Sequence, residues 1–156
     1  MKVRSVTKNK GKPVITLSPS DSLDKAVSLM MDLRIGSIVI TDDDELVGIL
    51  SEHDLLTILH NKHAMWTPLT VKDAMTPDPY VCDVDDSLED AMNTMVDYNV
   101  RHLPVVYKGA LKGMLSITDI VEELLRKAQF ENKLLKNYIQ NCPDEEDPQA
   151  KEKKQN

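Results

Sequence analysis

The sequence predicts a mixed α/β fold built from two copies of one unit, each in the order strand, helix, strand, strand, helix. A shift of 65 residues aligns 21–54 with 86–119 without a gap, and 11 of these 34 positions are identical. Average residue usage would give about two identities. Each copy also carries apolar runs of helical and strand spacing in the same order. The chain is therefore interpreted as a tandem duplication.

The first half of each unit is expected to be a short lead, a strand and a helix. Asp21 and Asp86 are the expected N-caps, because each is followed three residues later by an acid that suits the helix dipole. Apolar residues then recur at the spacing of one buried helical face. The leads are expected at 3–6 and 71–75, the strands at 14–17 and 80–82, and the apolar helical faces from Leu23 and from Leu88.

A hairpin and a second helix are expected to complete each unit. The strands are expected at 37–40 and 46–50, and at 103–106 and 111–115, with turns at 41–45 and 107–110. Each hairpin ends in a repeated phrase, Gly48-Ile49-Leu50-Ser51-Glu52-His53-Asp54 and Gly113-Met114-Leu115-Ser116-Ile117-Thr118-Asp119. The helix after the second phrase continues its apolar pattern to about Ile139.

The repeated phrase places Gly, Ser and Asp where a strand turns into a helix. Gly lets the backbone approach a ligand closely, and the first helical turn has N–H donors that suit a phosphate. The Asp carboxylate can accept hydrogen bonds from two adjacent hydroxyls, as an acidic residue does when it holds a ribose. Ser-x-x-Asp is also a capping box, which satisfies only the helix's own donors. Two copies with the same Gly favour ligand binding, and both interpretations stay open.

Composition excludes several classes of protein. The 156 residues are 41% hydrophobic and 29% charged, which is ordinary for a soluble globular chain. No apolar run approaches the roughly 20 residues of a membrane span, and the N-terminus lacks a signal-peptide run, so we expect a cytoplasmic protein without a membrane partner. A net charge of −7 without a basic block argues against nucleic acid. Cys82 and Cys142 match no metal or redox spacing.

The expected boundaries follow from the repeat. Residues 1–64 form the first repeat, 65–70 a linker, 71–127 the second repeat, 128–140 a helical extension and 141–156 a disordered tail of acids and lysines. Each repeat has too small a sheet to bury much surface alone. We therefore expect the repeats to pack against each other.

Several separated motifs resemble the cystathionine-β-synthase (CBS) domain family. They are the two Gly-x-x-Ser-x-x-Asp phrases, the lead Val71-Lys72-Asp73-Ala74-Met75-Thr76-Pro77 and the run Asn99-Val100-Arg101-His102-Leu103-Pro104-Val105-Val106. The resemblance covers about 1–127. It implies two β-α-β-β-α repeats, paired by a pseudo-twofold axis into a disc with two clefts between them.

The resemblance also implies adenosine-containing ligands in these clefts: AMP, ADP, ATP, S-adenosylmethionine or a dinucleotide. Asp54 and Asp119 would hold the ribose, with Ser51 and Ser116 beside the ribose or α-phosphate. Adenine would rest near Val14-Ile15 and Tyr80-Val81 and on the strands that begin at Ile38 and at Leu103-Pro104. Because Arg101 and His102 precede the middle strand of the second repeat, the Asp54 cleft is expected to be the better nucleotide site, with Arg101 and His102 on the phosphates.

The leading functional prediction is a stand-alone regulatory module in which an adenine nucleotide shifts an equilibrium between two arrangements of the disc. The partner that responds to this change would be another protein or a second copy of the chain. Because family members commonly pair disc to disc, a homodimer that also uses the final helix is expected. The alternative is a structural module with empty clefts. No enzyme and no metal site are expected, because no nucleophile–base pair or ligand cluster has a recognisable spacing.

Overall fold

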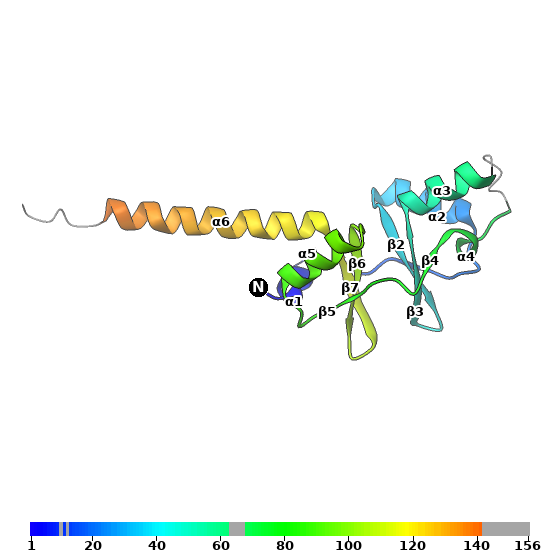
Figure 1. Cartoon of the computed structure of the whole chain (residues 1–156), viewed down its shortest axis with the longest axis horizontal. Helices are drawn as coiled ribbons and strands as arrows, with labels where there is room; N and C mark the ends of the chain where they lie inside the picture. The colour runs from blue at the N-terminus through cyan, green and yellow to red at the C-terminus, as the bar shows by residue number, and fades with distance from the viewer. Residues whose placement is uncertain (10, 12, 63–67, 142–156) are drawn as a thin grey trace, which may run out of the picture. The chain divides into compact units, whose positions relative to one another are not determined.

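The structure, a computed structural model, describes residues 1–9, 11, 13–62 and 68–141. It divides into two compact units, one up to Val121 and one from Glu122. The predicted mixed α/β class with two repeats is confirmed. In chain order the elements are α1 (Val3–Asn9), β1 (Thr16–Leu17), α2 (Leu23–Leu33), β2 (Ser37–Asp42), β3 (Glu45–Ser51), α3 (Glu52–Lys62), α4 (Val71–Ala74), β4 (Thr76–Pro77), β5 (Cys82–Asp83), α5 (Leu88–Asp97), β6 (His102–Tyr107), β7 (Ala110–Ser116) and α6 (Ile117–Gln140) (Figure 1).

Each repeat contributes one sheet. In the first, the strand order is β1-β2-β3-β4, and in the second it is β5-β6-β7. The first strand of each repeat pairs parallel to the next, and the two long strands pair antiparallel as a hairpin. The hairpin turns have positive φ at Asp43 and Asp44, and at Lys108 and Gly109, as tight hairpins require. Both predicted hairpins are confirmed, and the first strands are shorter than predicted.

The N-caps of α2 and α5 lie one residue later than predicted. Ser22 accepts a hydrogen bond from the Lys25 amide at 3.1 Å, and Ser87 caps α5 in the same way. The Asp21 carboxylate instead accepts from the Ser18 amide at 2.8 Å and from the Lys25 ammonium at 2.9 Å. The preceding Asp therefore closes the turn that leads into the helix, and the shorter Ser side chain satisfies the helix donors.

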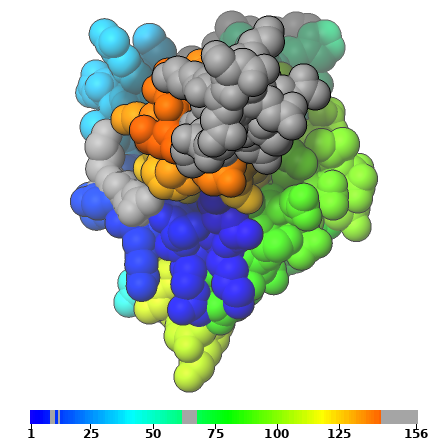
Figure 2. Space-filling model, turned by 90° about the vertical axis from the view of Figure 1, so that its left-hand side faces the viewer, coloured from blue at the N-terminus to red at the C-terminus, as the bar shows by residue number. Residues whose placement is uncertain are grey.

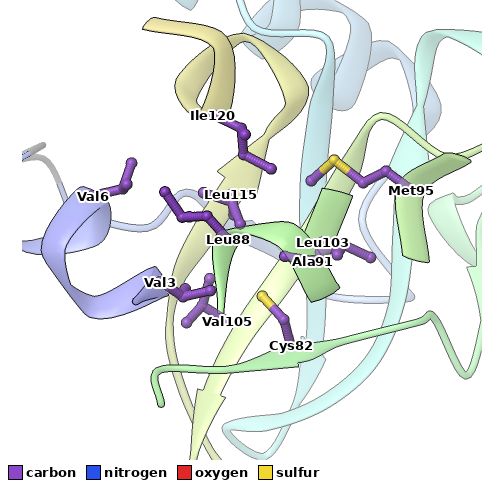
Figure 3. Close-up of a cluster of buried hydrophobic side chains, with 10 residues drawn as sticks. All are labelled: Val3, Val6, Cys82, Leu88, Ala91, Met95, Leu103, Val105, Leu115 and Ile120. Atoms are coloured by element: carbon purple, nitrogen blue, oxygen red, sulfur yellow. The ribbon is translucent and has the colours of Figure 1, made fainter. Parts of the chain in front are cut away.

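The leads pack into the opposite repeats, which the sequence analysis did not predict. Val3 and Val6 of α1 are buried with Leu88, Leu103 and Leu115 in the core of the second repeat, although they open the first (Figure 3). In Figure 2 the blue N-terminal residues lie directly against green residues of the second repeat. Conversely, Val71, which opens the second repeat, is fully buried in the core of the first.

Backbone hydrogen bonds fix both exchanged leads. The Val3 amide donates to the Asp86 carbonyl at 3.0 Å, and the Val71 amide donates to the Asp21 carbonyl at 2.8 Å. Strand β4, which also belongs by sequence to the second repeat, pairs with Gly48 and Ile49 of β3. The two repeats are consequently interlocked and share one folded unit.

Helix α6 continues to Gln140, so the predicted long final helix is confirmed. From Leu124 onward its large apolar side chains are more than 40% exposed. No helix in the described residues is both long enough and apolar enough to span a membrane. Residues 65–67 of the predicted linker at 65–70 and residues 142–156 of the predicted tail at 141–156 lie outside the described residues.

Candidate functional site

Both repeated corners form reciprocal capping bonds. At the first, the Ser51 amide and hydroxyl donate to Asp54 Oδ2 at 2.8 and 2.9 Å, and the Asp54 amide donates back to Ser51 Oγ at 3.3 Å. Ser116 and Asp119 repeat this pattern, with both bonds to Asp119 Oδ2 at 2.7 Å. The predicted capping bonds are therefore present at both corners, and they use Oδ2 of each carboxylate.

The second oxygen of Asp54 points to the other repeat's lead. Asp54 Oδ1 accepts a hydrogen bond from the Thr76 hydroxyl at 2.9 Å. Close approach of this lead depends on Gly48, because a β-carbon there would lie 2.8 Å from Met75 Sδ and 3.0 Å from the Thr76 carbonyl oxygen. At the equivalent Gly113 the nearest atom would be 3.6 Å away. The two corners are thus alike in hydrogen bonding and differ in how tightly a lead packs over them.

Each corner opens into its own cleft. The Asp54 cleft has a volume of about 520 Å³ and includes Ser51, Thr76 and Tyr80 in its lining. The Asp119 cleft has a volume of about 650 Å³ and includes Ser116. Gly36 and His102 line both clefts, so the wall between the clefts is formed at the start of β2 and β6.

The exchanged leads explain why each cleft draws on both repeats. After α1 packs into the second repeat, the chain must return to the first, and it passes Asp119 at 13–15. After α4 packs into the first repeat, the chain passes Asp54 at 78–80 on its way to β5. Each cleft therefore combines the Asp of one repeat with the connecting segment of the other.

The apolar residues expected around adenine divide into two groups. Val14 and Ile15 line the Asp119 cleft, and Tyr80 lines the Asp54 cleft. The side chains of Ile38, Leu103 and Pro104 are instead buried in the sheets and line neither cleft, and Val81 is 42% exposed outside both. Strand alternation explains Ile38: on β2, Ser37 and Val39 face the cleft and Ile38 faces the core.

The cationic residues are distributed differently from the sequence expectation. Arg101 and His102 line the Asp54 cleft, where they were expected. The sequence analysis missed Arg34 and Lys112, which line the Asp119 cleft. Arg34 is the C-cap of α2 with a φ of 52°, and Asn99 has the same φ at the equivalent position. Arg34 and Asn99 are equivalent positions of the repeat and each lines one cleft, so the repeat alignment around Arg101 could have drawn attention to Arg34 as a lining residue.

The sequence analysis also missed an aromatic pair. Tyr80 and Tyr98 stack with ring centroids 3.8 Å apart and planes 18° apart, and both line the Asp54 cleft. Their equivalents in the first repeat, Ile15 and Leu33, are aliphatic. Among the described residues no group of three His, Cys, Asp or Glu side chains could hold a metal ion.

This geometry defines a tandem-repeat module with two inter-repeat clefts, each built on a Gly-x-x-Ser-x-x-Asp corner. Comparison with known proteins identifies the family: the model of the CBS domain matches residues 3–61 and 71–126. The chain belongs to the CBS domain family.

Three relatives illustrate the match. An uncharacterised protein of Methanocaldococcus jannaschii is 33% identical over 135 residues, which are 78% of this chain and 32% of that protein. A CBS-domain-containing protein of Agrobacterium tumefaciens superimposes with a TM-score of 0.75 at 31% identity, over 79% of this chain and 98% of that one. CBSX2, solved in complex with AMP, superimposes with a TM-score of 0.68 at 30% identity, over 81% of this chain and 98% of that one. The chain spans 17–39% of the length of the first four curated relatives that it matches.

Proposed function

We propose that this chain is a regulatory module that binds an adenosine-containing ligand, such as AMP, ADP, ATP or S-adenosylmethionine, in its inter-repeat clefts. The observation that carries the proposal is the position of Asp54 and Asp119, each half-buried in the lining of a cleft. Volumes of about 520 and 650 Å³ fall in the range of small-molecule sites. The complex of CBSX2 with AMP supports an adenylate as the ligand class.

In this proposal the Asp carboxylates hold the ribose hydroxyls while they continue to cap their helices. A carboxylate oxygen has more than one lone pair, so capping and ligand binding are compatible. At Asp54 the Thr76 hydroxyl occupies Oδ1, and a ribose hydroxyl would share or replace that bond. Ser51 and Ser116 would lie beside the ribose or α-phosphate, with Val14, Ile15 and Tyr80 against the base.

The proposed signal is a shift between arrangements of the repeats or between oligomeric states. A ligand moves such an equilibrium only by its difference in affinity for the two states. Apolar side chains are exposed at equivalent positions of the two repeats, Met31 with Val96 and Leu56 with Val121. Helix α6 adds exposed apolar residues up to Ile139. We propose that these surfaces pair two copies of the chain or receive a regulated protein.

A second candidate is a purely structural module with empty clefts. The complete capping bonds at both corners favour it, because Ser51, Asp54, Ser116 and Asp119 then need no ligand to explain them. Isothermal titration with AMP, ATP and S-adenosylmethionine separates the two candidates. Binding heat supports the regulatory proposal, and its absence in folded protein at high micromolar ligand supports the structural one.

The decisive variant is Asp54→Asn combined with Asp119→Asn. Asn keeps a side-chain oxygen that can accept the bond from the Ser51 or Ser116 amide, so the fold should persist. Each lost charge-assisted hydrogen bond should weaken binding by about 1.5–3 kcal/mol. Asp73 provides the matched control, because it caps α4 through the same bonds from Thr70 and lines neither cleft. Asp73→Asn should leave the affinity unchanged; equal losses in both variants would point to a structural effect and against the proposed ribose contact.

The pairing of two copies is tested separately. Leu135 is 63% exposed on α6, and Leu135→Glu should lower the dimer fraction in sedimentation experiments if this helix contributes to pairing. Lys136→Glu is the control, because it changes charge on the same turn without removing an apolar side chain. Unchanged dimerisation in Leu135→Glu would remove α6 from the proposed interface.

A further inference from the structure

The two clefts have opposite charge around equivalent ribose-binding corners. Among the described residues and apart from Asp119, the charged residues that line the Asp119 cleft are Arg34 and Lys112, which give a formal charge of +2. Apart from Asp54, those that line the Asp54 cleft are Glu52, Asp78 and Arg101, which give −1. His102 lines both clefts and His53 lines only the Asp54 cleft; both are counted as neutral in these formal charges.

The cations of the Asp119 cleft are available to a ligand. Arg34 and Lys112 are exposed, and neither side chain has a hydrogen-bond or ion-pair partner among the residues that the structure describes. A guanidinium presents a fork of donors that matches phosphate oxygens, and an ammonium adds a second compact charge. Arg34 lies at the C-terminal end of α2, next to the lining residue Ile35, and Lys112 lies on β7, next to the lining residue Gly113. A phosphate in this cleft would therefore reach both cations without rearrangement of the fold.

The Asp54 cleft is built for a different 5′ substituent. Glu52 Cδ and His102 Cε1 both lie within 4 Å of one point, the position of a β-carbon on Gly36. A carboxylate thus stands at the inner wall of the cleft, and Asp78 adds another to its lining. The stacked Tyr80 and Tyr98 rings are also part of this lining. Carboxylates repel a phosphate, while aromatic faces attract cations.

From these differences we infer that the clefts select different adenosyl ligands. The Asp119 cleft takes a 5′-phosphorylated adenosine, and the Asp54 cleft takes an adenosyl compound without phosphate that is neutral or positively charged at its 5′ substituent. This assignment rests on the proposed function, and it reverses the sequence expectation, which considered Arg101 without its acidic neighbours. Arg101 in this cleft would then offset part of the acidic charge.

The assignment is tested by titration of the full chain with probes that share adenosine and differ in charge: AMP, adenosine and S-adenosylmethionine. We expect AMP and S-adenosylmethionine to bind together without competition. Asp119→Asn should weaken AMP at least tenfold and leave S-adenosylmethionine unchanged, and Asp54→Asn should do the reverse. Arg34→Gln should weaken AMP about tenfold, while Arg34→Lys, which loses the fork of donors but keeps the charge, should weaken it less. Circular dichroism confirms that each variant is folded.

Three results would overturn the assignment. Loss of AMP binding in Asp54→Asn with retention in Asp119→Asn would restore the sequence expectation. Competition between the two probes for one cleft would show that charge does not separate them. If no probe binds folded protein, the proposed function itself fails, and that outcome is distinct from the first two, in which ligands bind and only their distribution is wrong.

Discussion

Replacement of Val71 by alanine tests the exchange of leads. Val71 is fully buried in the core of the first repeat. The substitution removes two methyl groups, which are worth about 1.6 kcal/mol of transfer free energy at ~0.8 each. The cavity left behind raises the loss of unfolding free energy to about 2–3 kcal/mol. For a chain of this size that corresponds to a decrease in Tm of roughly 5–10 °C.

The location of the loss matters more than its size. Hydrogen exchange should show weakened protection first in β2 and β3 for Val71→Ala, and first in β6 and β7 for Val3→Ala, because local opening follows local packing. Val96→Ala is the control, since Val96 is 69% exposed and its loss should change stability by less than about 0.5 kcal/mol. The reverse pattern, with each lead protecting its own repeat, would refute the exchange.

Three further predictions concern stability. Gly48→Ala should cost about 1–3 kcal/mol in urea unfolding because its β-carbon overlaps the neighbouring lead, while Gly113→Ala should be nearly neutral; equal costs would contradict the packing difference. Burial raises the pKa of the Cys82 thiol from 9.0 to about 12, so its contribution to stability is present below pH 9 and is lost as pH rises toward 12. The unfolding free energy, measured in urea at several pH values above 9, should therefore fall less steeply with pH in Cys82→Ala than in the unchanged chain. An equally steep fall in both would count against this role of Cys82. The hydrogen bond from the Lys25 ammonium, with one from the Ser18 amide, lowers the pKa of Asp21 below 3.8, so its contribution is present above that pH and is lost as pH falls through the folded-state pKa. Urea unfolding at pH 7 and at pH 3 measures how much unfolding free energy is lost between the two pH values. That loss should be smaller for Asp21→Asn than for the unchanged chain, and an equal loss would rule out this role.

Much of the fold followed from local pattern. The 65-residue repeat located both hairpins and both corners, because each strand and turn carries its own spacing and turn residues. The N-cap was one residue off because Asp21 and Ser22 are both good caps, and only the geometry shows which side-chain oxygen accepts the hydrogen bond from the helix amide. Strand alternation could have predicted that Ile38 faces the core.

The composition of the clefts was harder to predict because it depends on contacts between repeats. Val3 and Val71 each lie in a short apolar stretch that would fit either core equally well, and the neighbouring sequence does not indicate which repeat buries them. Arg34 and Lys112 come from different repeats and line the same cleft only because both repeats surround it. A pattern read along one segment cannot indicate which cations a distant segment supplies.

The interlocking of the repeats constrains how the chain folds as it is synthesised. Val3 and Val6 leave the ribosome long before the core that buries them is complete, because that core also requires Ile120. The first sheet, by contrast, can close once β4 at Thr76–Pro77 is available. Domains usually fold from the N-terminus during translation. Here α1 must wait for β7 and the first turn of α6, so this early helix is among the later elements of the two repeats to reach its final place.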